Sequence, residues 1–381
     1  MDLLKTSSAN EREERLLKHI KPFNKIGAQH DRKQTVPIEN IQVLRDCGYA
    51  ALAVEKEFGG LEVPLSEWLR LQELIAREDG PTALSIGWHM GTMYQEAQEK
   101  NWPKIHRQHV LKAVVNNGLL LNTAATEKAT GSPTRGGVFQ TSAKKTSEGW
   151  LINGEKTFYT LAEHLDYYLV LATIEEDGST GVFLIKKGTE GVTINPTWDM
   201  VAMGSTGSHD LVLDQVILQE DALLKVQVRK ELPQAWLLHI PACYLGIGYA
   251  AIQEAATYAR TYAPNSIGKP IATIPTVRQR LGEAMLLYQQ SQSILYGVSK
   301  QWDEASIDER KTMHLSFMMT KHSVVQHAIN MVDLSMKVVG AQSLAHASPL
   351  SRYYRNVRAG LHNPPMDDQT VEFAAKTVLN E

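Results

Sequence analysis

The sequence predicts an α+β protein in which a middle antiparallel β domain separates two helical regions. Apolar residues recur at helical spacing before residue 120 and after residue 232, whereas short β-branched runs fall between residues 119 and 218. A chain of 381 residues can bury a large core and normally divides into two or three domains. We therefore expect an N-terminal helical domain at residues 1–120, the β domain at 121–225 and a C-terminal helical domain at 226–381.

Two helices can be placed in the N-terminal region. The first covers residues 37–47, because Pro37 stands at its start and Gly48 directly follows its end. The second begins near Pro64, and its apolar residues recur at helical spacing, at Trp68, Leu71, Leu74 and Ile75. These apolar faces are typical of core helices.

The β domain is predicted from runs of β-branched and aromatic residues. A first strand is expected at 119–125, and an Asn153-Gly154 turn is expected to join strands 150–153 and 156–160 as a hairpin. Further strands are expected at 167–174, 181–186 and 210–218. Together they predict a small antiparallel sheet.

The C-terminal region is predicted to be a four-helix bundle. Helical periodicity covers residues 232–262, 276–302, 308–344 and 369–379, and the first three segments are long. Helices of this kind cannot bury their apolar faces alone, so they must pack on one another.

A polar turn after the first strand is a candidate ligand site. Thr126, Gly131 and Ser132 offer hydroxyl and backbone donors, and Gly131 permits close approach of a ligand to the backbone. Such donors suit a flat heterocycle rich in carbonyl groups. The same residues are also common in ordinary solvated turns.

Several segments, in order along the chain, resemble the acyl-CoA dehydrogenase superfamily. They are Val54-Glu55-Lys56-Glu57-Phe58-Gly59-Gly60, Thr126-Glu127 through Gly131-Ser132, Leu151-Ile152-Asn153-Gly154-Glu155-Lys156, and Gly191-Val192 before Trp198. The resemblance covers nearly the whole chain. It implies a β domain between two helical domains, a flavin at their junction, and a homodimer or homotetramer in which a second subunit completes each flavin site.

The resemblance also assigns individual residues. Thr126 would contact the isoalloxazine ring, and Ser132 would lie near the flavin and the substrate thioester. Phe158, at a position where many members have Trp, and Thr160 would flank the flavin, with a core strand as the alternative for both. Trp198, with the small-residue loop at 204–208, would lie near the substrate; the alternative for the loop is a flexible turn. Gly340 and Ala341 would approach the partner subunit's cofactor, and Ala341 stands where the family has its second glycine.

One departure concerns the cofactor. Pro264 and Ile267 stand where the family commonly has the Arg and Phe of its pyrophosphate-binding segment. Arg260 or Arg278 could replace that Arg, and Gly268 and Lys269 keep the local pattern. FAD is therefore expected, with FMN open.

A second departure concerns the catalytic base. Pro364 and Trp236 occupy the two positions at which family members carry a glutamate. His362 is the first replacement candidate, because imidazole titrates near neutral pH, although it could simply form hydrogen bonds in a loop. Asp367 and Glu231 are weaker candidates. His89 could point into the same cavity, but it is better interpreted as a packed helix residue.

Three functions remain open from the sequence, and the resemblance favours the first of them. The first is oxidation of the α,β bond of an acyl-CoA thioester, with hydride transfer to flavin N5 and electrons leaving through a separate acceptor protein. The second is a two-component flavin monooxygenase supplied with reduced flavin by a partner reductase, which the His-x-Pro segment at His362 resembles. The third is a relative that binds flavin or acyl-CoA without catalysis.

Composition excludes other classes. The formal net charge is −3 with no basic cluster, so nucleic acid is not an expected partner. No nicotinamide-binding Gly-x-Gly-x-x-Gly segment and no metal-ligand spacing are present. No apolar run is expected to reach membrane-spanning length, and Cys47 and Cys243 are expected to be buried free thiols. These features predict a cytoplasmic protein without a membrane partner.

Overall fold

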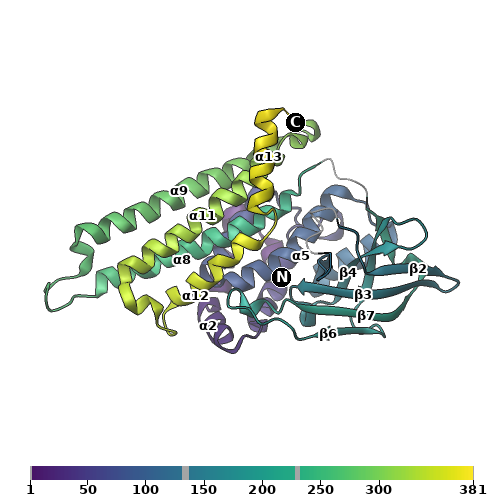
Figure 1. Cartoon of the computed structure of the whole chain (residues 1–381), viewed down its shortest axis with the longest axis horizontal. Coiled ribbons are helices and arrows are strands. Elements are labelled where there is room, and N and C mark those ends of the chain that lie inside the picture. The colour runs from purple at the N-terminus through teal and green to yellow at the C-terminus, as the bar shows by residue number, and fades with distance from the viewer. Residues whose placement is uncertain (1, 131–136, 228–231, 381) are drawn as a thin grey trace.

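The computed structural model describes residues 2–130, 137–227 and 232–380. The molecule is elongated, with the sheet at one end, the long C-terminal helices at the other, and α5 between them (Figure 1). The predicted α+β class, with a β domain between two helical regions, is confirmed.

The N-terminal region consists of helices with identifiable ends. The predicted helix at 37–47 is present as Ile38–Cys47, and Gly48 ends it in the left-handed conformation with φ of 88°. Ser8 caps the first helix by accepting a hydrogen bond from the Glu11 amide at 3.2 Å. The helices are α1 (Ala9–Ile20), α2 (Phe23–Lys33), α3 (Ile38–Cys47), α4 (Leu65–Glu78), α5 (Gly80–Glu99), α6 (Lys104–His106) and α7 (Lys112–Asn117).

The strands form one sheet in the order β6-β7-β3-β2-β4-β5-β8, and β1 also pairs with β4. The strands are β1 (Leu121–Ala124), β2 (Ser142–Thr146), β3 (Gly149–Tyr159), β4 (Tyr167–Ile174), β5 (Thr180–Lys186), β6 (Val192–Asn195), β7 (His209–Leu218) and β8 (Leu223–Val226). The predicted antiparallel arrangement holds for most pairs, but β1 and β2 both run parallel to β4. Strands β2, β6 and β8 were not predicted from the sequence.

The predicted Asn153-Gly154 hairpin is wrong. Strand β3 runs straight through both residues and pairs with β7 on either side, with a register shift between Ile152 and Gly154. Gly154 is required for a different reason, because a Cβ there would lie 2.5 Å from Thr141 Oγ1. The hairpin turn instead joins β2 to β3, where Thr146 pairs with Gly149.

The C-terminal helices pack around α8. They are α8 (His239–Thr261), α9 (Pro275–Glu304), α10 (Ile307–Lys311), α11 (His314–Val339), α12 (Pro349–Val357) and α13 (Asp367–Leu379). Helices α9, α11 and α12 pack on α8, and α4 from the N-terminal region covers another side of it. Helix α13 lies across one end of the long helices (Figure 1).

The expectation that no apolar run reaches membrane-spanning length is wrong for α8. Among the described residues, the helical segment Ala235–Thr261 is long and apolar enough to cross a membrane by those two measures, but 83% of the tested window is buried inside the protein. A helix surrounded by other helices must be apolar on every side, so the same composition arises in a core helix.

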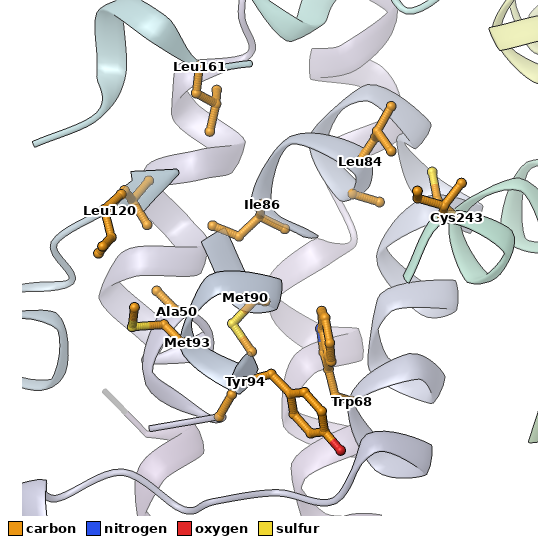
Figure 2. Close-up of a cluster of buried hydrophobic side chains, with 14 of the residues drawn as sticks. Ala50, Trp68, Leu84, Ile86, Met90, Met93, Tyr94, Leu120, Leu161 and Cys243 are labelled. Carbon is orange, nitrogen blue, oxygen red and sulfur yellow. The ribbon is translucent and has the colours of Figure 1, made fainter. Parts of the chain in front are cut away.

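The core is continuous across the regions. Figure 2 shows side chains of α4 and α5 beside Leu120, Leu161 and Cys243, which lie just before β1, just after β3 and in α8. Cys47 and Cys243 are both free and buried, as predicted. The helical regions therefore share one core with the inner end of the sheet.

A buried ion pair joins the N-terminal and C-terminal helices. Asp79 caps α5 by accepting hydrogen bonds from the Thr82 amide at 3.1 Å and the Thr82 hydroxyl at 2.7 Å. The same carboxylate accepts a hydrogen bond from Arg352 of α12 at 2.8 Å, and both side chains are nearly fully buried. Removing one charge would leave the other buried without its partner.

Substitution of Asp79 by Asn tests the contribution of this ion pair to stability. The amide can still cap α5, but the Arg352 charge loses its partner, so the free energy of unfolding should fall by about 3 kcal/mol in a urea titration. Glu304→Gln, which disrupts an exposed pair with Lys300, serves as the control and should cause no measurable loss. Equal effects of the two substitutions would contradict the assigned role.

Candidate active site

One large cavity lies between the sheet, α5, the segment just before α8 and the C-terminal helices. Its volume is about 1560 Å³. One wall comes from the sheet, with Thr126, Phe158, Thr160 and Ser208, and the opposite wall comes from α11, α13 and the segment around His362. A cavity of this size accommodates a cofactor together with a substrate.

Three hydroxyl groups on the sheet side form a chain with a fixed direction. Thr206 donates its hydroxyl proton to the Met203 carbonyl at 2.9 Å, so Thr206 must accept from Ser208, whose oxygen is 2.8 Å away. Ser208 in turn accepts from Thr160 at 3.0 Å, because each hydroxyl has one proton. The oxygen of Thr160 therefore faces the cavity as an acceptor and calls for a donor on the ligand.

Two aromatic rings beside this chain present an uncovered apolar face. Phe158 adopts a positive φ of 56°, and its side chain is 53% exposed within the cavity wall. Its ring meets Trp198 edge to face at 5.7 Å, and Trp198 is fixed by a hydrogen bond from Nε1 to the Met203 carbonyl at 3.1 Å. A flat ligand can cover Phe158 in the way that apolar rings favour.

An ion pair beneath the sheet wall holds the segment after β1. Glu127 lies 2.6 Å from Lys156 of β3 and also accepts from the amides of Gln140 and Thr141 at 2.7 and 3.1 Å. Burial alone would raise the pKa of Glu127, but the hydrogen bonds from Lys156 and these neighbours lower it to about 2. Glu127 is therefore ionised at neutral pH and serves to position Thr126.

His362 lies on the opposite wall with an exposed side chain. Its segment is held by Tyr244, which donates to Asn363 Oδ1 at 2.5 Å, and by the pair of Arg358 and Asp333 at 2.8 Å. Pro364 also lines the cavity. An imidazole next to an apolar surface can exchange a proton with a ligand.

Neither position expected to carry a glutamate is itself a carboxylate. Pro364 lines the cavity, and Trp236 packs against the buried ring of His239 and the edge of Trp88. Three carboxylates line the cavity among the described residues. Glu127 pairs with Lys156, and Glu372 lies 3.3 Å from Lys376 in an exposed pair. Glu96 Oε1 lies 2.9 Å from Arg107, but its Oε2 has no partner in the described part of the chain, and burial raises the pKa of Glu96 to about 7.

Other residues singled out in the sequence lie elsewhere. His89 is buried and bonded to the backbone, with Nε2 2.9 Å from the Ala50 carbonyl, and burial lowers its pKa to about 4. Gly340 and Ala341 follow the C-terminal end of α11 and do not line this cavity. At a rise of 1.5 Å per residue, they lie roughly 27 Å along the helix from the residues of α11 that do. Their role toward a second subunit stays a prediction. Gly131, Ser132 and Glu231 lie outside the described residues.

Several charged residues of the cavity and one pairing were not predicted from the sequence, and the most deeply buried of the cations is Lys321. Lys321 lines the cavity from α11, although a lysine four residues after Phe317 on an apolar face was a signal that could have revealed it. Glu127 and Lys156 were noted separately, but nothing local indicates that they pair. Asp367, a candidate base, instead accepts a hydrogen bond from Lys321 at 3.3 Å.

Comparison with known proteins identifies the family. Three family descriptions match in order: the acyl-CoA dehydrogenase N-terminal domain at residues 14–116, the middle domain at 122–216 and the C-terminal domain at 238–361. "Putative acyl-CoA dehydrogenase YdbM" of Bacillus subtilis (strain 168) is 45% identical over 92% of this chain and 91% of its own length. The chain belongs to the acyl-CoA dehydrogenase family.

Solved structures agree with this fold. Butyryl-CoA dehydrogenase from Megasphaera elsdenii superimposes with a TM-score of 0.85 at 18% identity and covers 96% of this chain and 98% of its own. TdsC from Paenibacillus sp. A11-2, in complex with FMN and indole, also gives 0.85, at 20% identity and 96% of both chains. At these identities the likeness establishes the fold.

Members of the acyl-CoA dehydrogenase family are flavin-dependent oxidoreductases, and so is this one. The sheet wall fits a flavin, because the acceptor oxygen of Thr160 and the uncovered ring of Phe158 suit the ring N–H and flat face of an isoalloxazine. We expect Thr126, Phe158 and Thr160 to hold the ring.

Glu127→Gln should destabilise this acyl-CoA dehydrogenase family member by about 3 kcal/mol at pH 7, because Lys156 then lacks its charged partner. The pKa of Glu127 is lowered in the folded state, so its stabilisation is present above the ordinary carboxyl value and is lost as the pH falls towards about 2. The difference in free energy of unfolding between the wild-type protein and the variant should therefore decrease below about pH 4. Urea titrations at several pH values measure this difference, and Glu148→Gln in the exposed β2–β3 turn is the control. A difference that does not change with pH would disprove the ionised pair of Glu127 and Lys156.

Proposed function

We propose that this protein is a flavin-dependent monooxygenase that receives reduced flavin and inserts one oxygen atom into a small, largely apolar substrate. The observation that carries the proposal is that Pro364 and Trp236 stand at the two positions where the resembling family carries the glutamate that removes the α-proton of a thioester. Monooxygenation needs no α-proton abstraction. The FMN and indole complex of TdsC, on the same fold, is further support.

The residues of the cavity would divide the work. Bound reduced flavin supplies two electrons to O₂, so that one oxygen atom enters the substrate and the other leaves as water. Thr160 accepts a hydrogen bond from the ring, and Phe158 with Trp198 covers one face of it. Trp88, Trp236 and Pro364 exclude bulk water from the substrate side. His362 donates or accepts the proton at the reacting oxygen.

Reducing equivalents would come from a partner. The sequence has no Gly-rich nicotinamide-binding segment after a strand, so a separate reductase is expected to supply the reduced flavin. Both FMN and FAD are compatible with the sheet wall. A second copy of the chain is expected to complete the cofactor site, in line with the resemblance on which the roles of Gly340 and Ala341 rest.

A second candidate function is oxidation of the α,β bond of an acyl-CoA thioester, with the α-proton removed by a base and hydride passed to flavin N5. The name of the 45% identical relative favours it. In this case His362 would be the base, and the electrons would leave through a separate acceptor protein.

An oxygen-labelling experiment tests the first candidate. Protein mixed with chemically reduced FMN or FAD, then with ¹⁸O₂ and indole as probe, should release a product carrying one labelled oxygen atom. His362→Ala should lower the yield about 100-fold with flavin content retained, because general acid–base groups typically contribute at least this much. His346→Ala, at an exposed histidine outside the cavity, should leave the yield unchanged.

An anaerobic titration separates the two candidates. Acyl-CoA thioesters of several chain lengths are added to the oxidised flavoprotein without oxygen, and the flavin absorbance is followed. We expect no bleaching. Bleaching by any thioester, together with no labelled product from indole, would replace the monooxygenase proposal by the dehydrogenase one.

A further inference from the structure

A buried lysine lines the cavity at the end away from the sheet. Four residues on one face of α11, at helical spacing, contribute to the wall: His314, Phe317, Met318 and Lys321. Lys321 is only 1% exposed, although lysine is among the residues least often buried. A charge in this position requires compensation.

The protein compensates the Lys321 charge only in part. Its ammonium has three N–H donors, and its acceptor among the described residues is Asp367 Oδ1 at a long 3.3 Å. Asp367 is itself shared, with His322 Nδ1 at 3.2 Å and Gln326 Nε2 at 3.2 Å. Burial lowers the pKa of Lys321, as expected for an ammonium with incomplete compensation.

Lys321 differs in this respect from the other cations of the same wall. Arg358 bonds its own carboxylate, Asp333, at 2.8 Å, and Lys376 lies 3.3 Å from Glu372 on the exposed side of α13. Lys321, the most deeply buried of these three cations, therefore has one shared carboxylate as its partner, and two of its donors have no partner among the residues that the structure describes.

We propose that Lys321 binds an anionic oxygen of the ligand in this cavity, a carboxylate or a phosphate. This deepens the proposed function, because it names the substrate class as an apolar body carrying an acidic group at the end away from the flavin ring. The same chemistry could come from the phosphate of the flavin. A charge-assisted hydrogen bond from a buried ammonium would hold either group.

Matched ligand pairs test the proposal and separate the two sources. Cinnamate and cinnamamide, which differ in charge but hardly in shape, are titrated into the oxidised flavoprotein, and FMN and riboflavin are titrated into the apoprotein. Intrinsic tryptophan fluorescence reports binding, since Trp88 and Trp236 line the cavity. No turnover is involved, so the result does not depend on whether the monooxygenase proposal holds.

Two substitutions should act in opposite directions. Lys321→Met nearly keeps the length of the side chain. It should lower the affinity for the anionic member of one ligand pair about tenfold or more and leave the affinity for the neutral member unchanged. Asp367→Asn removes the competing carboxylate and should tighten the same anion. Lys337→Met, at an exposed lysine on the same helix, is the control. A purely structural role would make both Lys321→Met and Asp367→Asn weaken binding together.

The pair that responds identifies the source of the anion. A response confined to cinnamate assigns Lys321 to the substrate, and one confined to FMN assigns it to the flavin phosphate. The proposal is overturned if the wild-type protein prefers neither anion, if Lys321→Met keeps the preference, or if Asp367→Asn weakens the anion as Lys321→Met does.

Discussion

Burial of α8 is the constraint on which the rest of the structure depends. The first half of α8, up to Ile252, is apolar on nearly all sides and must be covered on all of them. The cover comes from α4 in the N-terminal region and from α9, α11 and α12 in the C-terminal region. Asp79 and Arg352 fix the two groups against each other. With the helices held this way, the segment that leads into α8 lines the cavity together with the sheet.

The cavity joins two walls of different chemistry. On the sheet wall, the hydroxyl group of Thr160 donates to Ser208, Ser208 donates to Thr206, and Thr206 donates to the Met203 carbonyl. The oxygen of Thr160 is therefore left as a hydrogen-bond acceptor. The helical wall combines apolar side chains with cations, Glu372 and the imidazole rings of His314 and His362. The first wall suits the flavin that the family uses, and the second governs what reacts with it, which is why membership of the family does not by itself name the reaction.

Features encoded by short segments could be predicted from the sequence. The ends of α3 and the strands at 167–174 and 210–218 follow from local patterns. The family resemblance of the ordered segments singled out Phe158, Thr160 and Trp198, which all line the cavity. The Asn153-Gly154 step misled because it is a strong local hairpin signal. Pairing of β3 with β7 and the close approach of Thr141 override that signal, and both come from distant parts of the chain.

The charges of the site could not be predicted in the same way. Glu127 and Lys156 are 29 residues apart, and Lys321 and Asp367 are 46 apart. Their pairing depends on how strands and helices pack, which a single sequence does not show. Lys321 also lies within an apolar helical pattern, where a lone cation is ordinarily assumed to face solvent.

The participation of α13 in the cavity wall has a consequence for the order of events during synthesis. Residues 369, 372, 373 and 376 line the cavity together with residues of α5, nearly three hundred positions earlier. Since chains emerge from the ribosome N-terminus first, the helical core around α5 can begin to form long before the cavity can close. A ligand that touches both walls therefore binds only after α13 has emerged, and its binding free energy then stabilises the finished fold.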